Sequence, residues 1–76
     1  MKEFLEFIVK HLVESPDQVS VAAMESEGRQ LYKLSVGPGD LGRVIGKEGR
    51  TAKALRTILM AASARKGLQA SLEILD

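Results

Sequence analysis

Apolar residues recur at helical spacing near the start of the chain. Over residues 2–14 they cover one broad side and charged residues share the other; the apolar positions are Phe4, Leu5, Phe7, Ile8, Val9, Leu12 and Val13. A repeat of about 3.6 residues predicts an amphipathic helix. We expect this helix to end at Ser15-Pro16-Asp17, because proline disfavours the α region in the residue before it and cannot extend the hydrogen-bond ladder.

Three later segments alternate in the manner of β-strands, at residues 18–25, 31–36 and 68–75. Side chains of a strand point to opposite faces in turn, so each segment has one apolar face that suits a core. In the third segment the inward positions are Leu68, Ala70, Leu72 and Ile74. Residues 25–29 are predicted to join the first two strands as a hairpin turn, and Gly37-Pro38-Gly39 ends the second strand.

Two helices are predicted between the second and third strands. Asp40 is well suited to cap a short helix over Leu41–Ile45. A longer helix follows over residues 50–66, with a core stripe at 3 and 4 spacing that consists of Ala52, Leu55, Ile58, Leu59 and Ala62. Gly67 follows the basic pair Arg65-Lys66 and is the expected C-terminal stop.

The order of these elements predicts one α+β domain over residues 1–76, with the sequence α-β-β-α-α-β. A strand, two helices and a second strand form a crossover unit, which favours parallel pairing of those two strands. The hairpin adds an antiparallel pair. We therefore expect a three-stranded mixed sheet with the helices packed on one face.

The most specific pattern is the loop Gly46-Lys47-Glu48-Gly49, which lies between the two predicted helices. Glycine adopts positive φ at little cost and leaves room for a ligand's backbone to approach. A turn of this kind can present its own amides, and the start of the following helix, to anionic oxygens. The loop is thus a candidate phosphate-binding element.

Charge is concentrated around this loop although the chain as a whole carries only +1. Residues 39–66 hold seven basic and two acidic residues, a net charge of +5, whereas the remaining residues carry −4. Such a distribution is expected if one face meets a polyanion. The basic residues are Arg43, Lys47, Arg50, Lys53, Arg56, Arg65 and Lys66.

Other kinds of chemistry find little support in the composition. The chain has no cysteine, which excludes disulfides and thiolate metal sites and fits the cytoplasm. No acid–base pair, metal cluster or partnered nucleophile can be assembled, and His11 is expected to be a packed or surface residue. We expect a soluble cytoplasmic protein that is not an enzyme, uses no cofactor or metal, and does not associate with a membrane.

The run from Gly42 to Arg56, with this element order around it, resembles the KH family in its bacterial type II arrangement, and more narrowly the small stand-alone KhpA-type proteins. The resemblance implies binding of single-stranded RNA, with the GxxG loop clamping about four nucleotides. RNA chaperoning or post-transcriptional regulation is the implied role. The candidate RNA-binding residues are Arg43, Val44, Ile45, Gly46, Lys47, Glu48, Gly49, Arg50 and Lys53.

Each group of candidates has its own expected contact. Lys47 and the loop amides would meet phosphate oxygens, flanked by Arg43, Arg50 and Lys53, while Val44 and Ile45 would offer an apolar floor for bases. Ala52 departs from the broad KH pattern, which often has a bulky aliphatic residue there, and no aromatic residue lies near the loop. We therefore expect weak affinity and modest base selectivity from a single copy.

The long helix has a second face of small residues around one methionine: Ala54, Thr57, Met60, Ala61 and Ala64. This face is a candidate dimer interface, because small residues let another helix approach closely. The alternative is an alanine-rich surface that serves helix propensity alone. The resemblance implies a homodimer and pairing with a larger multidomain KH-containing protein.

Two other functions remain open at this stage. The first is a protein-interaction adaptor whose KH fold mainly mediates dimerisation with a partner. The second is a DNA-binding helix-turn-helix, which the two neighbouring helices and the basic character of the longer one allow. The four-residue Gly-x-x-Gly turn suits the second function poorly.

Overall fold

Three strands and three α-helices follow one another in the predicted order in the computed structural model, which describes residues 1–75. The elements are α1 (Lys2–Leu12), β1 (Ser20–Ser26), β2 (Arg29–Ser35), α2 (Leu41–Ile45), α3 (Arg50–Ala64) and β3 (Gln69–Leu75). Two short 3₁₀ turns, Pro16–Gln18 and Lys47–Gly49, lie in the connections. The α+β class and the α-β-β-α-α-β order are thereby confirmed.

The sheet is mixed, with β2 at its centre. β1 runs antiparallel to β2, so that Ser20 is aligned with Ser35 and Ser26 with Arg29. β3 runs parallel to β2, so that Arg29 is aligned with Gln69. The crossover and hairpin arguments therefore predicted both pairings correctly.

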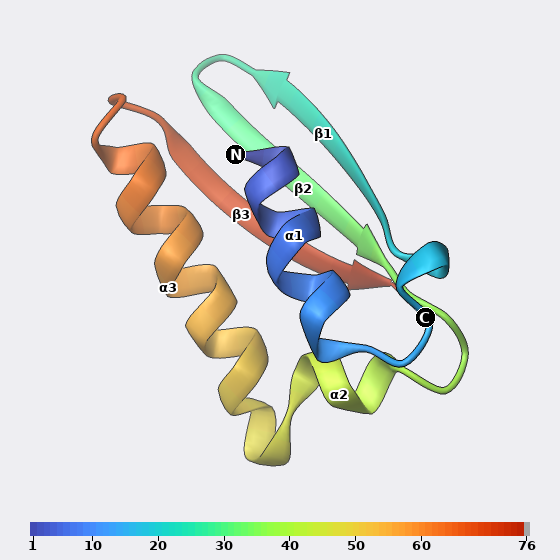
Figure 1. The fold of residues 1–76 in the computed structure, drawn as a ribbon. Helices are drawn as coiled ribbons and strands as arrows, with labels where there is room; N and C mark the ends of the chain where they lie inside the picture. Colours follow the sequence, from blue (N-terminus) through green and yellow to red (C-terminus); the bar gives the residue numbers. More distant parts are fainter. Residues whose placement is uncertain (76) are drawn as a thin grey trace.

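α1 and α3 cover the same face of the sheet, and the short α2 packs against both of these helices near the end of α1, as Figure 1 shows. The core lies between the two layers and joins α1 and α3 to the central strand; it consists of Leu5, Val9, Val21, Tyr32, Leu34, Val44, Leu55, Leu59 and Leu72. On the opposite face Met24 is half exposed. One layer of helices on one face of a sheet is thus the frame that carries α2 and the glycine loop.

The hairpin is tighter than the sequence indicated. Glu27 and Gly28 alone form the turn, with φ of 51° and 78°. Two consecutive residues of positive φ are typical of a type I′ turn, whose twist matches that of the flanking strands. β2 consequently begins at Arg29, two residues before the predicted start.

The connection from α1 to β1 also differs from the prediction. α1 ends at Leu12 because Val13 is already extended, at φ −103° and ψ 162°. The 3₁₀ turn Pro16–Gln18 then takes Gln18 out of the expected strand, and β1 begins at Ser20.

Asp40 does not cap α2 with its side chain, which corrects the sequence-based expectation. Its carboxylate instead accepts hydrogen bonds from the backbone N–H groups of Glu14 and Ser15, at 3.1 and 3.0 Å. These two amides follow the end of α1 and need acceptors of their own. The carboxylate thus connects the end of α1 to the start of α2.

The core stripe of α3 is narrower than predicted, because Ile58 is exposed and Ala62 is only half-buried. Ala52, Leu55 and Leu59 are buried as predicted, and Ser63 continues the row. Ile58, in contrast, is 41% exposed, because a residue beside Leu59 is turned by about 100° away from the sheet. On α1 the flank with Phe4 and Phe7 is likewise uncovered, since Leu5 and Val9 are the side chains that point to the sheet.

α3 ends at Ala64, two residues before the predicted end, and Gly67, with a φ of +70°, is the residue at which the chain leaves the last turn. The N–H of Gly67 donates to the carbonyl of Ala64, and the N–H of Leu68 donates to that of Ser63, both at 3.0 Å. This pattern satisfies carbonyls that a helix end leaves free, and it needs a left-handed residue. The chain can then turn sharply into β3.

Candidate nucleic-acid interface

The glycine loop connects α2 to α3 through three residues of positive φ. Gly46 has φ 77° and ψ 174°, Glu48 has φ 58°, and Gly49 has φ 74°. The loop is held by backbone hydrogen bonds from Gly46 N–H to the Gly42 carbonyl at 2.8 Å and from Gly49 N–H to the Gly46 carbonyl at 3.2 Å. The result is a sharp turn whose shape is set mainly by the backbone.

The two glycines serve different purposes. A Cβ on Gly46 would lie 2.3 Å from Oγ1 and 2.9 Å from the backbone nitrogen of Thr51, so Gly46 makes room for the start of α3. A Cβ on Gly49 would meet nothing within 4 Å. The open space for an approaching ligand is therefore beside Gly49, whereas the sequence reading assigned it to both glycines.

The cations around the loop are not equivalent. Lys47 and Lys53 are exposed, and among the described residues neither forms an ion pair. Arg50 lies with its guanidinium 3.6 Å from the carboxylate of Glu48, and both side chains are largely exposed. The weak pairing of two exposed side chains leaves Arg50 available to another anion.

Arg43 has acidic partners within the protein. Its guanidinium forms an ion pair with Glu14, and its Nε lies 3.6 Å from the buried carboxylate of Asp40. An RNA phosphate would have to compete with both carboxylates for this side chain. Arg43 is thus the least available of the four predicted cations.

The two apolar candidates before the loop, Val44 and Ile45, differ in burial. Val44 is completely buried in the core, so it offers no surface to a base, and its effect is to fix α2 against the sheet. Ile45 is 38% exposed and is the accessible member of the pair. Two adjacent apolar residues in a five-residue helix gave no means of telling from the sequence alone which one is buried.

A hollow along the middle of α3 was not found by sequence reasoning. It lies between α3 and β3, has a volume of about 160 Å³, and is lined by Arg56, Leu59, Met60, Ala70, Ser71 and Leu72. Arg56 follows Lys53 by three positions and shares its side of α3. The hollow depends on the parallel docking of β3, which neither segment reveals by itself.

The predicted dimer face is solvent-exposed in the single chain. This holds for all five of its residues, Ala54, Thr57, Met60, Ala61 and Ala64. Ile58 adjoins it, four positions after Ala54 and three before Ala61, so the apolar surface is larger than predicted.

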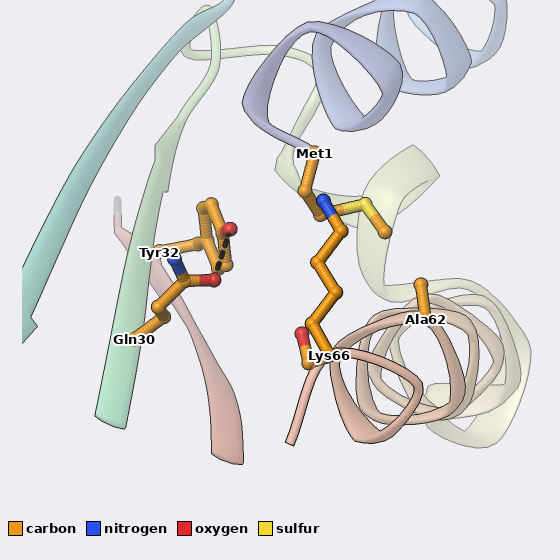
Figure 2. Close-up of a pocket in the computed structure, with 6 residues that line it drawn as sticks. Met1, Gln30, Tyr32, Ala62 and Lys66 are labelled. Carbon is orange, nitrogen blue, oxygen red and sulfur yellow. Dashed lines mark hydrogen bonds between the residues drawn. The ribbon is translucent and has the colours of Figure 1, made fainter. Parts of the chain in front are cut away.

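At the opposite end of α3 lies a small polar cavity of about 90 Å³ (Figure 2), lined by Met1, Gln30, Tyr32, Ala62, Ser63 and Lys66. Tyr32 donates a hydrogen bond from its hydroxyl to Oε1 of Gln30 at 2.7 Å. Burial, and then the negative charges of Glu25 and Glu3, raise the pKa of Tyr32. The tyrosine consequently stays protonated at neutral pH and acts as a structural donor.

Within residues 1–75, no three or more acidic, histidine or cysteine side chains lie together in a cluster suited to a metal ion. None of the described helices combines the length and the apolar character needed to cross a bilayer. His11 is an exposed residue, as expected, with Nδ1 2.7 Å from the Phe7 carbonyl and its ring packed against the Phe7 ring.

Comparison with known proteins finds a family and relatives that match this chain over almost its whole length. The family model described as KhpA/KhpB, KH domain, matches residues 2–74. The RNA-binding protein KhpA of Chlamydia trachomatis is 46% identical over 76 residues, which cover 100% of this chain and 97% of that protein. Its counterparts in Clostridium acetobutylicum and Listeria monocytogenes are 44% and 43% identical, over 99% and 100% of this chain and 100% of each relative.

Proposed function

This chain belongs to the KhpA/KhpB KH-domain family, and we propose on that premise that it binds single-stranded RNA without catalysis, using the loop from Gly46 to Gly49 to clamp the sugar-phosphate backbone. The observation that carries the proposal is the left-handed turn at Gly49, which has open space around it at the start of α3 and is flanked by Lys47 and Lys53, neither of which forms an ion pair within residues 1–75. The KH fold with a GxxG loop is a known means of holding about four nucleotides.

Phosphate recognition would combine three features of the loop. Lys47 supplies a mobile charge, and Arg50 and Lys53 extend the positive surface along the first turn of α3. The N-cap residue of α3, Gly49, makes no side-chain capping hydrogen bond, so the positive end of the helix dipole faces the loop. Phosphate contacts of this kind position a strand but carry no sequence information.

Bases would be accommodated by the exposed side chain of Ile45 before the loop and by the hollow further along α3. Ile45 is the exposed apolar residue before the loop, and the hollow between α3 and β3 continues along the side of Lys53 and Arg56. The described aromatic side chains do not line this hollow, so stacking contributes little. We therefore expect low base selectivity, which suits an RNA chaperone or a post-transcriptional regulator in the cytoplasm.

Self-association would compensate for weak binding by one copy. We propose a homodimer through the exposed face of α3, and the same face could bind a larger multidomain KH-containing protein. Two linked sites on one RNA strand raise the overall affinity through effective concentration. In the adaptor alternative the same face is the principal site of function and the loop is dispensable.

The double variant Lys47→Asp, Glu48→Asp tests the clamp. It removes the loop cation, and aspartate tolerates the positive φ of position 48, so the turn can be retained. We expect gel shifts on mixed single-stranded RNA to disappear while the circular dichroism spectrum is unchanged. For the parent protein, three phosphate contacts correspond to a slope of about −2 in log K against log salt.

A matched control is offered by Lys2→Asp, Glu3→Asp, which makes the same chemical change at two exposed neighbouring positions of α1. RNA binding should survive this control apart from a small long-range charge effect. Equal loss in both double variants would mean that overall charge is responsible. Retention of RNA binding in the loop variant would reject the clamp and favour the adaptor.

A further inference from the structure

Asp40 is an acidic residue that is almost completely buried, with 3% of its surface exposed. Its two carboxylate oxygens are both used, since one accepts the N–H of Glu14 at 3.1 Å and the other the N–H of Ser15 at 3.0 Å. No buried polar side-chain atom lacks a partner within the described part of the chain. A buried carboxylate satisfied by backbone donors fixes the segments it joins, because leaving those groups unpaired is costly.

The backbone of the same residue begins α2. The N–H of Asp40 donates to the Gly37 carbonyl at 2.9 Å, and its own carbonyl accepts the N–H groups of Arg43 and Val44 at 3.0 and 3.3 Å. One residue therefore holds the exit of α1 with its side chain and the entry of α2 with its main chain. Arg43 extends the connection through its ion pair with Glu14.

α2 has only five residues, which is too short to be stable or oriented by its own hydrogen bonds. Its position depends on its tertiary contacts, which include its packing against α3, the buried side chain of Val44 and the connection made by Asp40. Gly46 follows α2 directly, so a tilt of α2 about Val44 would move the glycine loop relative to Lys53 on α3. α3 itself is anchored to the sheet by Leu55 and Leu59.

We propose that Asp40 is a positioning residue for RNA binding: it holds α2 to the end of α1 and so keeps the loop from Gly46 to Gly49 in the geometry that receives a phosphate. This inference rests on the proposed function of the loop. Asp40 itself contacts no RNA, since its carboxylate is buried and already occupied by Glu14, Ser15 and Arg43.

The direction of the change in RNA affinity distinguishes positioning by Asp40 from a general electrostatic effect of its charge. Removing a negative charge from a domain that binds a polyanion strengthens binding if long-range charge alone matters. Positioning predicts the opposite for Asp40→Asn, because an NH₂ group would then face a backbone N–H donor and the connection would loosen. If the competent geometry falls to about a tenth of the population, apparent affinity falls about tenfold.

The experiment compares three variants with the parent protein. Asp40→Asn keeps the shape and removes the charge, whereas Asp40→Glu keeps the charge and displaces the carboxylate by one methylene. Leu5→Val, in the core of α1 and outside the loop and the hollow between α3 and β3, is a control for general loss of stability. For each protein we would measure the melting temperature, the affinity for a mixed-sequence single-stranded RNA, and the amide NMR spectrum of positions 46–53 without RNA.

We expect both Asp40 variants to shift the loop amides of the free protein and to bind RNA several-fold to tenfold more weakly, while Leu5→Val does neither at a temperature where all three are folded. Unchanged loop amides in folded Asp40→Asn or Asp40→Glu would overturn the inference. Stronger RNA binding by Asp40→Asn would do the same. If the parent protein binds no RNA, the proposed function fails, and the loop amides still decide whether Asp40 positions the loop.

Discussion

At the scale of single residues, the loop shows that two glycines in one motif can be needed for different reasons. Gly46 combines a positive φ with a ψ of 174° and packs against Thr51. Gly49 has a left-handed conformation that other residues adopt at a moderate cost, and it has open space around it. The first glycine is therefore required mainly by the fold, and the second is placed to serve the ligand.

This difference predicts unequal effects of alanine. Gly49→Ala should cost about 1 kcal/mol of unfolding free energy, the usual penalty of a left-handed residue with a Cβ. Gly46→Ala should cost clearly more, since its Cβ also meets the Thr51 backbone nitrogen at 2.9 Å. Urea denaturation of both variants measures the two costs.

The RNA affinities of the Gly46→Ala and Gly49→Ala variants test which glycine the RNA approaches. Gly49→Ala puts a methyl group into the space proposed for the phosphate, so its affinity should fall even where the protein is fully folded. Equal stability of the two variants would contradict the assignment of Gly46 to packing. Unimpaired RNA binding by Gly49→Ala would contradict the approach of RNA at that glycine.

A candidate residue could be predicted from the sequence where its role depends on neighbours in the chain, and not where it depends on distant partners. The loop and its flanking cations are contiguous in the chain, so spacing and residue type were sufficient to select them. The buried state of Val44, the exposure of Ile58 and the contacts of Asp40 depend on partners far away in the sequence. Arg43 was chosen for its charge, but its pairing with Glu14 requires α1 to end beside α2.

At the scale of elements, the hairpin is the clearest case of local geometry fixing a boundary. The turn of Glu27 and Gly28 requires positive φ at both residues, and glutamate is an unfavourable choice for the first. Asparagine followed by glycine is the preferred pair in such turns.

We predict that Glu27→Asn stabilises the domain by about 0.5 kcal/mol, because asparagine adopts the left-handed region more readily. Glu27→Gln is the matched control, since it removes the same charge without that preference. Thermal unfolding of the three proteins at one salt concentration provides the measurement. An equal gain from both substitutions would mean that charge, and not turn geometry, limits the hairpin.

The elements themselves were well predicted, and their ends less so. α2 has the predicted bounds, and the parallel and antiparallel pairings follow from general rules of chain connection. α1 ends two residues early because the amides of Glu14 and Ser15 bond to Asp40. A pattern of hydrophobicity carries no information about such a distant acceptor.

At the scale of the whole molecule, two exposed surfaces have different chemistry. The loop end presents the unpaired lysines, and the outer face of α3 presents small apolar residues together with Met60 and Ile58. The two surfaces share one helix, so a partner on α3 would hold two loops in a fixed relation.

We predict that Met60→Asp and Ala61→Asp shift the protein from dimer to monomer in sedimentation at high micromolar concentration, since an unpaired charge in a helix interface is costly. Met24→Asp is a close control, because Met24 is 51% exposed on the open face of the sheet and Met60 is 53% exposed. The control should sediment like the parent protein.

In Ala61→Asp, which leaves the loop and the hollow between α3 and β3 intact, weaker RNA binding should accompany the loss of the dimer, because avidity is lost. A parent protein that is monomeric at these concentrations, and is unaffected by Met60→Asp, would reject the interface. Dissociation of the dimer by Met24→Asp instead would place the interface on the open face of the sheet.

The parallel pairing of β2 with β3 also governs the order in which the molecule can assemble. Arg29 is aligned with Gln69, forty positions further along the chain, whereas its other partner, Ser26, is three positions away. Local contacts form early and distant ones are delayed by the entropy of closing the intervening segment. During synthesis the hairpin therefore emerges from the ribosome with one side of its central strand vacant, and only the arrival of β3 completes the sheet that supports the loop.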